Sequence, residues 1–168
     1  MKMEEYFMKK QSKILAILMI LALTLGLLSA CAKDEKKTGT DSANVAVEDV
    51  KMEYIGVDDV KENLDADKYL IVDLRKADDY KAGHIPGAIP ADLDVIVSGK
   101  DFEKGKEVVK TAVEGKDKPI VLVCYSGKKY AQAGTNVLKA LGHDMSKVFT
   151  LEGGMKAWTE KYADAIEK

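Results

Sequence analysis

Short apolar runs alternate, from residue 51 to residue 168, with longer segments whose apolar residues recur at helical spacing. The short runs predict strands at residues 52–55, 69–73, 120–123 and 148–151, with a short edge strand within 85–90. The longer segments predict helices at residues 57–64, 102–113, 129–141 and 155–162. Strands that alternate with helices are typical of a parallel sheet covered by helices, so we expect one α/β domain over residues 51–168.

Residues 1–30 have the pattern of a secretory leader. An uncharged apolar stretch, residues 14–28, follows several lysines and is shorter than the roughly 20 apolar residues that a spanning helix needs. Leu28, Ser29 and Ala30 run into Cys31 and together resemble the bacterial lipobox, whose cysteine becomes the first mature residue and is acylated. The alternatives are an ordinary signal peptide or an N-terminal membrane anchor that contains a cysteine by chance.

Residues 31–50 are rich in Lys, Asp, Glu, Thr, Ser and Gly and show no apolar periodicity. Such a segment cannot bury enough apolar surface to fold, so we expect a flexible tether. An acylated Cys31, carrying palmitate or a similar chain and followed by this tether, predicts a lipoprotein held on the extracytoplasmic face of the cell membrane.

Composition narrows the partners further. The 26 Lys and Arg residues nearly balance the 28 Asp and Glu residues, for a net charge of −2, so no basic excess is present to bind a nucleic acid backbone. The two cysteines, Cys31 and Cys124, lie in segments of different kinds, so we expect no disulfide between them. No spacing typical of metal ligands is visible, and we expect neither a metal nor a cofactor.

Cys124 follows the most apolar predicted strand, at the edge where open α/β sheets bind their ligands. A short turn then leads into a predicted helix, and its residues are Tyr125, Ser126, Gly127, Lys128 and Lys129. Backbone N–H groups in such a turn, the helix N-terminus and the two lysines all favour negative charge, so the pattern favours a thiolate that attacks sulfur, phosphorus or arsenic oxyanions. The alternative is that Cys124 is a small apolar residue at the end of a buried strand.

Three blocks resemble, in order, the signatures of the rhodanese domain family. They are residues 71–75 with 79–80 and 83–88, residues 121–127, and residues 151–155 with 157–158. The blocks extend over essentially the whole predicted domain. The resemblance implies a three-layer α/β fold with a five-stranded parallel sheet flanked by helices. It also implies that Cys124 carries sulfur as a persulfide, held by the N–H groups of the following turn.

Three further residues lie in the first of these blocks. We expect Asp73 and Arg75 to form an ion pair that fixes the loop beside the site, and Arg75 is also a candidate for substrate contact. His84 is predicted to be a hydrogen-bonded turn residue near the site rather than a base.

The resemblance implies a sulfurtransferase that takes sulfane sulfur from thiosulfate or a polysulfide and hands it to cyanide or a thiol. Lys129 stands where many active members have arginine, and it keeps the charge but lacks the bidentate fork. Related phosphatases and arsenate reductases use a loop longer by one residue that ends in arginine, whereas this position is Tyr130 here, which disfavours that chemistry.

With Cys31 acylated, Cys124 is the only free thiol, which fits sulfur relay to a separate acceptor. The second hypothesis is a non-enzymatic sulfur-binding or docking module on the cell exterior.

Overall fold

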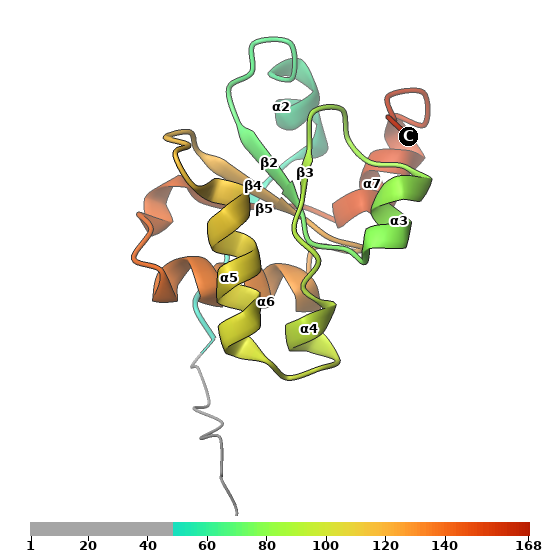
Figure 1. The fold of residues 1–168 in the computed structure, drawn as a ribbon. Coiled ribbons are helices and arrows are strands. Elements are labelled where there is room, and N and C mark those ends of the chain that lie inside the picture. Colours follow the sequence, from blue (N-terminus) through green and yellow to red (C-terminus); the bar gives the residue numbers. More distant parts are fainter. Residues whose placement is uncertain (1–48) are drawn as a thin grey trace, which may run out of the picture. The chain divides into compact units, whose positions relative to one another are not determined.

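The computed structural model describes residues 49–168, and the predicted leader, the predicted acylation site Cys31 and nearly all of the tether lie outside them. Within these residues a five-stranded parallel sheet forms, with the strand order β1-β5-β4-β2-β3 (Figure 1). The strands are β1 (Tyr54–Ile55), β2 (Leu70–Asp73), β3 (Ile89–Pro90), β4 (Ile120–Val123) and β5 (Val148–Leu151). The predicted α/β class and the five-stranded parallel sheet are therefore confirmed.

Helices connect the strands and cover both faces of the sheet. They are α2 (Val57–Glu62), α3 (Ala77–Ala82), α4 (Asp94–Val97), α5 (Phe102–Val113), α6 (Lys129–Ala140) and α7 (Gly154–Lys161), with a 3-10 turn at Met145–Lys147. No helix within residues 49–168 has the length and apolarity that crossing a membrane requires.

Two apolar clusters lie on opposite faces of the sheet, because successive side chains of a strand point to opposite sides. Leu122 of β4 packs in one cluster with residues of α5 and α6, whereas Val121 and Val123 pack in the other with Val60 of α2 and Trp158 of α7. All four residues of β4 are buried, as expected for the middle strand of a covered parallel sheet. The result is the predicted three-layer arrangement.

The long elements lie where the apolar pattern predicts them, and the short ones differ. Helix α5 and strands β4 and β5 have the predicted bounds, and the edge strand β3 lies within the predicted segment 85–90. Strand β1 is shorter than predicted, and α3 and α4 were not predicted at all. Helix α3 contains no buried residue, so it has no apolar stripe for a pattern to reveal.

Candidate active site

Cys124 lies directly after β4, at the carboxyl edge of the sheet. Main-chain hydrogen bonds tie residues 123 and 124 to two other segments of the chain. The carbonyl oxygen of Val123 accepts from the N–H of Leu74 at 2.8 Å, and that of Cys124 accepts from the N–H of Met155 at 2.7 Å. The loop after β2 and the start of α7 therefore converge on the position predicted to be catalytic.

The Cys124 side chain is only 2% exposed and belongs to the apolar cluster on the α5 and α6 face of the sheet. It forms no disulfide. Burial alone agrees with a small apolar residue that ends a strand, which was the alternative considered from the sequence. The chemistry of this position therefore depends on the loop that follows it.

The five residues after Cys124 carry main-chain donors with no partner. Within the described part of the chain, the N–H groups of residues 125–129 donate no hydrogen bond, and the next main-chain donor that does so is that of Gln132, to Lys128, at 2.8 Å. Gly127 is the one buried residue among these five, and a buried N–H without an acceptor is uncommon in folded proteins, whereas the other four residues are exposed. The loop can therefore offer free main-chain donors to an anion.

Two glycines allow the loop to fold back against the turn before α7. At Gly154, which has φ +61°, a Cβ atom would lie 2.4 Å from the Cys124 oxygen and 2.7 Å from the Ser126 and Gly127 nitrogens. At Gly127, which has φ +68°, a Cβ atom would lie 2.7 Å from the Leu151 oxygen. Both conformations favour glycine, and a side chain at either position would push the two segments apart.

Positive charge adds to the main-chain donors. Lys128 and Lys129 are exposed, and neither forms an ion pair with any residue between 49 and 168. They lie at the N-terminus of the 12-residue helix α6, whose dipole also favours an anion. The sequence predicted that the two lysines and the free loop amides lie next to one another, and the structure has them so.

The predicted ion pair between Asp73 and Arg75 is present and buried. The Arg75 Nη2 atom lies 2.6 Å from an Asp73 carboxylate oxygen and also donates to the Gly83 carbonyl oxygen at 2.7 Å, while Nε donates to Asp73. Asp73 is fully buried and Arg75 is 7% exposed. These bonds join the end of β2 to the turn at residue 83, and contact between Arg75 and substrate stays a prediction.

His84 is a turn residue held by neighbours, as predicted. Its Nδ1 atom lies 3.0 Å from the Tyr80 carbonyl oxygen, and its ring stacks on the Tyr80 ring with centroids 3.8 Å apart. Its main chain pairs with Glu167 near the C-terminus, so the turn is fastened to the end of the chain.

Sequence reasoning missed the tyrosine hydroxyls around the loop. Tyr125 donates to Asp79 of α3 at 2.5 Å, and Tyr130 donates to Asp94 of α4 at 2.7 Å. Burial, followed by the bonded carboxylate, raises the pKa of both phenols, so both keep their proton at neutral pH. Both acceptors lie on helices that the apolar pattern did not reveal, so the pattern held no signal for these bonds.

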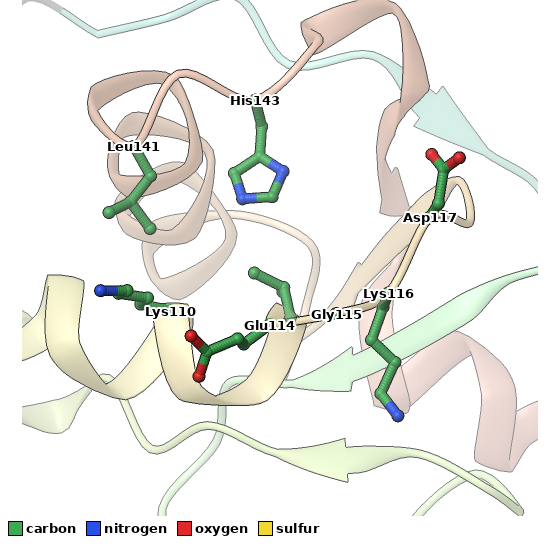
Figure 2. Close-up of a pocket in the computed structure, with 8 residues that line it drawn as sticks. Lys110, Glu114, Gly115, Lys116, Asp117, Leu141 and His143 are labelled. Atoms are coloured by element: carbon green, nitrogen blue, oxygen red, sulfur yellow. The ribbon is translucent and has the colours of Figure 1, made fainter.

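A cavity of about 450 Å³ lies at the other end of β4. Figure 2 shows Leu141 and His143 on one side of it and Lys110 and Glu114 on the other. It adjoins the chain that enters β4, whereas Cys124 follows the exit of that strand. The cavity is therefore separate from the loop after Cys124. Among residues 49–168 no cluster of three or more His, Cys, Asp or Glu side chains is arranged to hold a metal.

Comparison with known proteins adds independent information. A family model described as the rhodanese-like domain matches residues 56–161. Two curated relatives carry the name thiosulfate sulfurtransferase GlpE. The one from Pseudoalteromonas translucida is 29% identical over 118 residues, which cover 68% of this chain and 96% of the relative. The one from Pseudomonas savastanoi pv. phaseolicola is 30% identical over 95 residues, covering 56% of this chain and 76% of the relative.

Solved structures agree on the fold. The As-Sb reductase from Leishmania major matches with a TM-score of 0.54 and 26% identity, over 69% of this chain and 85% of that protein. Ygr203w from Saccharomyces cerevisiae, a homolog of single-domain rhodanese and of a phosphatase catalytic domain, matches with a TM-score of 0.55 and 16% identity. That match covers 67% of this chain and 83% of the yeast protein.

Proposed function

This chain belongs to the rhodanese-like domain family, and we propose that it is a sulfurtransferase that carries sulfane sulfur as a persulfide on Cys124. The observation that carries the proposal is the run of main-chain N–H groups, residues 125–129, that have no acceptor within the described residues. A persulfide is an anion with several lone pairs, so it supplies the acceptor that these donors lack. The ammonium groups of Lys128 and Lys129, which form no ion pair within residues 49–168, attract the anionic donor to the same loop.

The reaction takes two steps. The Cys124 thiolate attacks the outer sulfur of thiosulfate, the S–S bond of thiosulfate breaks, and its electron pair leaves with sulfite. Cyanide or an acceptor thiolate then attacks the outer sulfur of the persulfide, and the electron pair of that S–S bond returns to Cys124 as the thiolate. Charge balances in each step, since sulfite leaves with the two negative charges that thiosulfate brought and thiocyanate leaves with the one that cyanide brought.

The departure at Lys129 bears on the donor. An ammonium group presents a point charge, whereas the guanidinium of many family members holds an oxyanion with two parallel bonds. We therefore propose that thiosulfate binds loosely here and that a polysulfide is an equally good donor. The acceptor is a separate molecule, because Cys124 has no second thiol beside it among the described residues.

Location is a further part of the proposal, and it rests on the sequence alone. The apolar stretch before Cys31 and the polar segment after it support a lipid-anchored protein on the extracytoplasmic face of the cell membrane. Growth of the producing cells with labelled palmitate tests this, because the label should enter the wild-type chain and should be absent from Cys31→Ser.

Thiocyanate formation from thiosulfate and cyanide tests the activity. The wild-type chain should form thiocyanate, and Cys124→Ser should abolish its formation, because a serine hydroxyl cannot accept sulfane sulfur. Intact mass after donor treatment should show one added sulfur atom on the wild type and none on the variant. Thiocyanate formation that persists in Cys124→Ser would refute the assignment.

The burial of Cys124 favours a second candidate. A thiol that is 2% exposed fits a module that binds or docks without turnover. The same mass measurement separates the two candidates, since a protein that gains no sulfur from thiosulfate or from a polysulfide would be such a module.

A further inference from the structure

Two tyrosines stand at the ends of the loop after Cys124, and each bonds to a carboxylate on a different helix. Tyr125, the first residue of the loop, donates its hydroxyl to Asp79 of α3 at 2.5 Å. Tyr130, the first residue beyond the loop, donates to Asp94 of α4 at 2.7 Å. The two rings meet edge to face, with centroids 5.3 Å apart. We call these two bonds and the ring contact the tyrosine bracket.

Tyr125 is held by its hydroxyl as well as by packing. Tyr125 is 36% exposed, so apolar packing holds it only in part. Its hydroxyl oxygen also accepts from the main-chain N–H of Lys76 at 3.4 Å. The loop itself forms few other bonds, because its N–H groups have no partner within residues 49–168. A loop of this kind relaxes toward conformations in which water or carbonyl groups satisfy the amides, unless its ends are fixed.

We propose that Tyr125, through its hydrogen bond to Asp79, is a positioning residue that keeps the N–H groups of residues 125–129 directed at the sulfur bound to Cys124. The proposal rests on the proposed function, since it assigns Tyr125 a part in the stability of the persulfide. It also makes α3, which contains no buried residue, a support for the active loop. The hydroxyl acts only through the loop and touches neither donor nor acceptor.

The electrostatics of the bracket support this role. Burial and the bonded carboxylate raise the pKa of Tyr125, so its hydroxyl stays a donor through the neutral range. The carboxylate of Asp79, which is exposed to solvent, stays ionised at the same pH and so remains the acceptor of this bond.

The test measures the equilibrium between thiol and persulfide in the purified full-length protein. At a fixed ratio of thiosulfate to sulfite, intact mass gives the fraction of Cys124 that carries sulfur. Tyr125→Phe and Asp79→Ala should each lower the persulfide-to-thiol ratio about tenfold, the size expected when a hydrogen bond to a charged group is lost. Asp79→Asn should keep most of the wild-type ratio, because its amide oxygen still accepts from the Tyr125 hydroxyl.

Tyr162→Phe is the matched control. Its hydroxyl donates to Asp58 of α2 at 2.5 Å, which is a tyrosine–carboxylate bond of the same length that involves no residue of the loop. This variant should leave the persulfide ratio unchanged, whatever it does to thermal stability. An equal ratio in Tyr125→Phe and the wild type would overturn the proposal, and so would equal losses in Tyr125→Phe and Tyr162→Phe.

Hydrogen–deuterium exchange of the resting protein separates this proposal from the proposed function. In Tyr125→Phe the N–H groups of Met155 and Lys156, which donate to the carbonyl oxygens of Cys124 and Tyr125 at 2.7 and 3.1 Å, should exchange faster than in the wild type, because the loop that accepts these bonds is released. If the wild type gains no sulfur at all, the proposed function fails, and unchanged exchange would independently refute the bracket as a positioning device.

Discussion

Gly154→Ala perturbs the active loop through a single methyl group. The methyl carbon would lie 2.4 Å from the carbonyl oxygen of Cys124, far inside van der Waals contact. It would also lie 2.7 Å from the nitrogens of Ser126 and Gly127, two of the donors proposed to hold the persulfide. All three neighbours are main-chain atoms, so no flexible side chain can move aside, and the loop or the start of α7 must shift.

The magnitude follows from two costs. A non-glycine residue in the left-handed region, here at φ +61°, costs about 1–2 kcal/mol. Inserting a methyl group where the surroundings are already packed costs about 1–3 kcal/mol more. The free energy of unfolding should therefore fall by about 2–5 kcal/mol, which for a domain of this size lowers the Tm by about 8–20 °C.

Gly142→Ala is the matched control, because Gly142 has φ +81° and no atom within 4 Å of its Cβ position. It should lose only the conformational part, about 1–2 kcal/mol. Differential scanning calorimetry of both variants measures the stability, and thiocyanate formation below the lower Tm measures the activity. Gly154→Ala should be nearly inactive while still folded, whereas Gly142→Ala should be fully active. Equal losses of Tm, or full activity in folded Gly154→Ala, would refute the packing argument.

Three further predictions concern charge. Lys129→Ala should raise the KM for thiosulfate several-fold at low salt and by less at high salt. Lys139→Ala, an exposed residue of the same helix, should leave that KM unchanged. Arg75→Ala leaves a fully buried carboxylate unpaired and should lower the unfolding free energy in urea by about 3–5 kcal/mol, and a loss below about 1 kcal/mol would contradict this. Hydrogen bonds from Ser98 and then Tyr130 lower the pKa of Asp94 below its ordinary value of 3.8. The ionised carboxylate therefore stabilises the fold at pH values above 3.8, and this contribution is lost as the pH falls through the lower native pKa. Tyr130→Phe moves the native pKa back toward 3.8, so its Tm should fall less between pH 7 and pH 3 than that of the wild type.

The apolar pattern predicts the central elements well because burial and periodicity coincide there. Strand β4 has four buried apolar residues in a row, and α5 carries its buried residues on one face between a capping Asp101 and the turn at Gly115. Helices α3 and α4 have no buried residue, so contacts elsewhere in the fold determine where they form. The local pattern of apolar residues therefore cannot predict where these two helices form.

The candidate site likewise has a part that the sequence predicts and a part that it does not. Cys124, the glycines and the lysines stand close together in the sequence, and their resemblance to a known loop identifies them together. The bonds from Tyr125 to Asp79 and from Tyr130 to Asp94 join residues 46 and 36 positions apart. Only the folded chain brings these partners together, and neither acceptor lies on an element that the sequence pattern predicts.

The low exposure of Cys124 and its proposed chemistry agree once the transferred atom is considered. In a persulfide the sulfur that is handed on lies about 2 Å beyond the cysteine sulfur, so the buried atom is the one that stays. Burial would keep water and competing thiols away from that atom, and the loop amides would hold the terminal sulfur in place. A conformationally loose loop would lose both effects. The rigid ties at its ends, the tyrosine bracket on one side and the close contact with Gly154 on the other, are therefore what such chemistry requires.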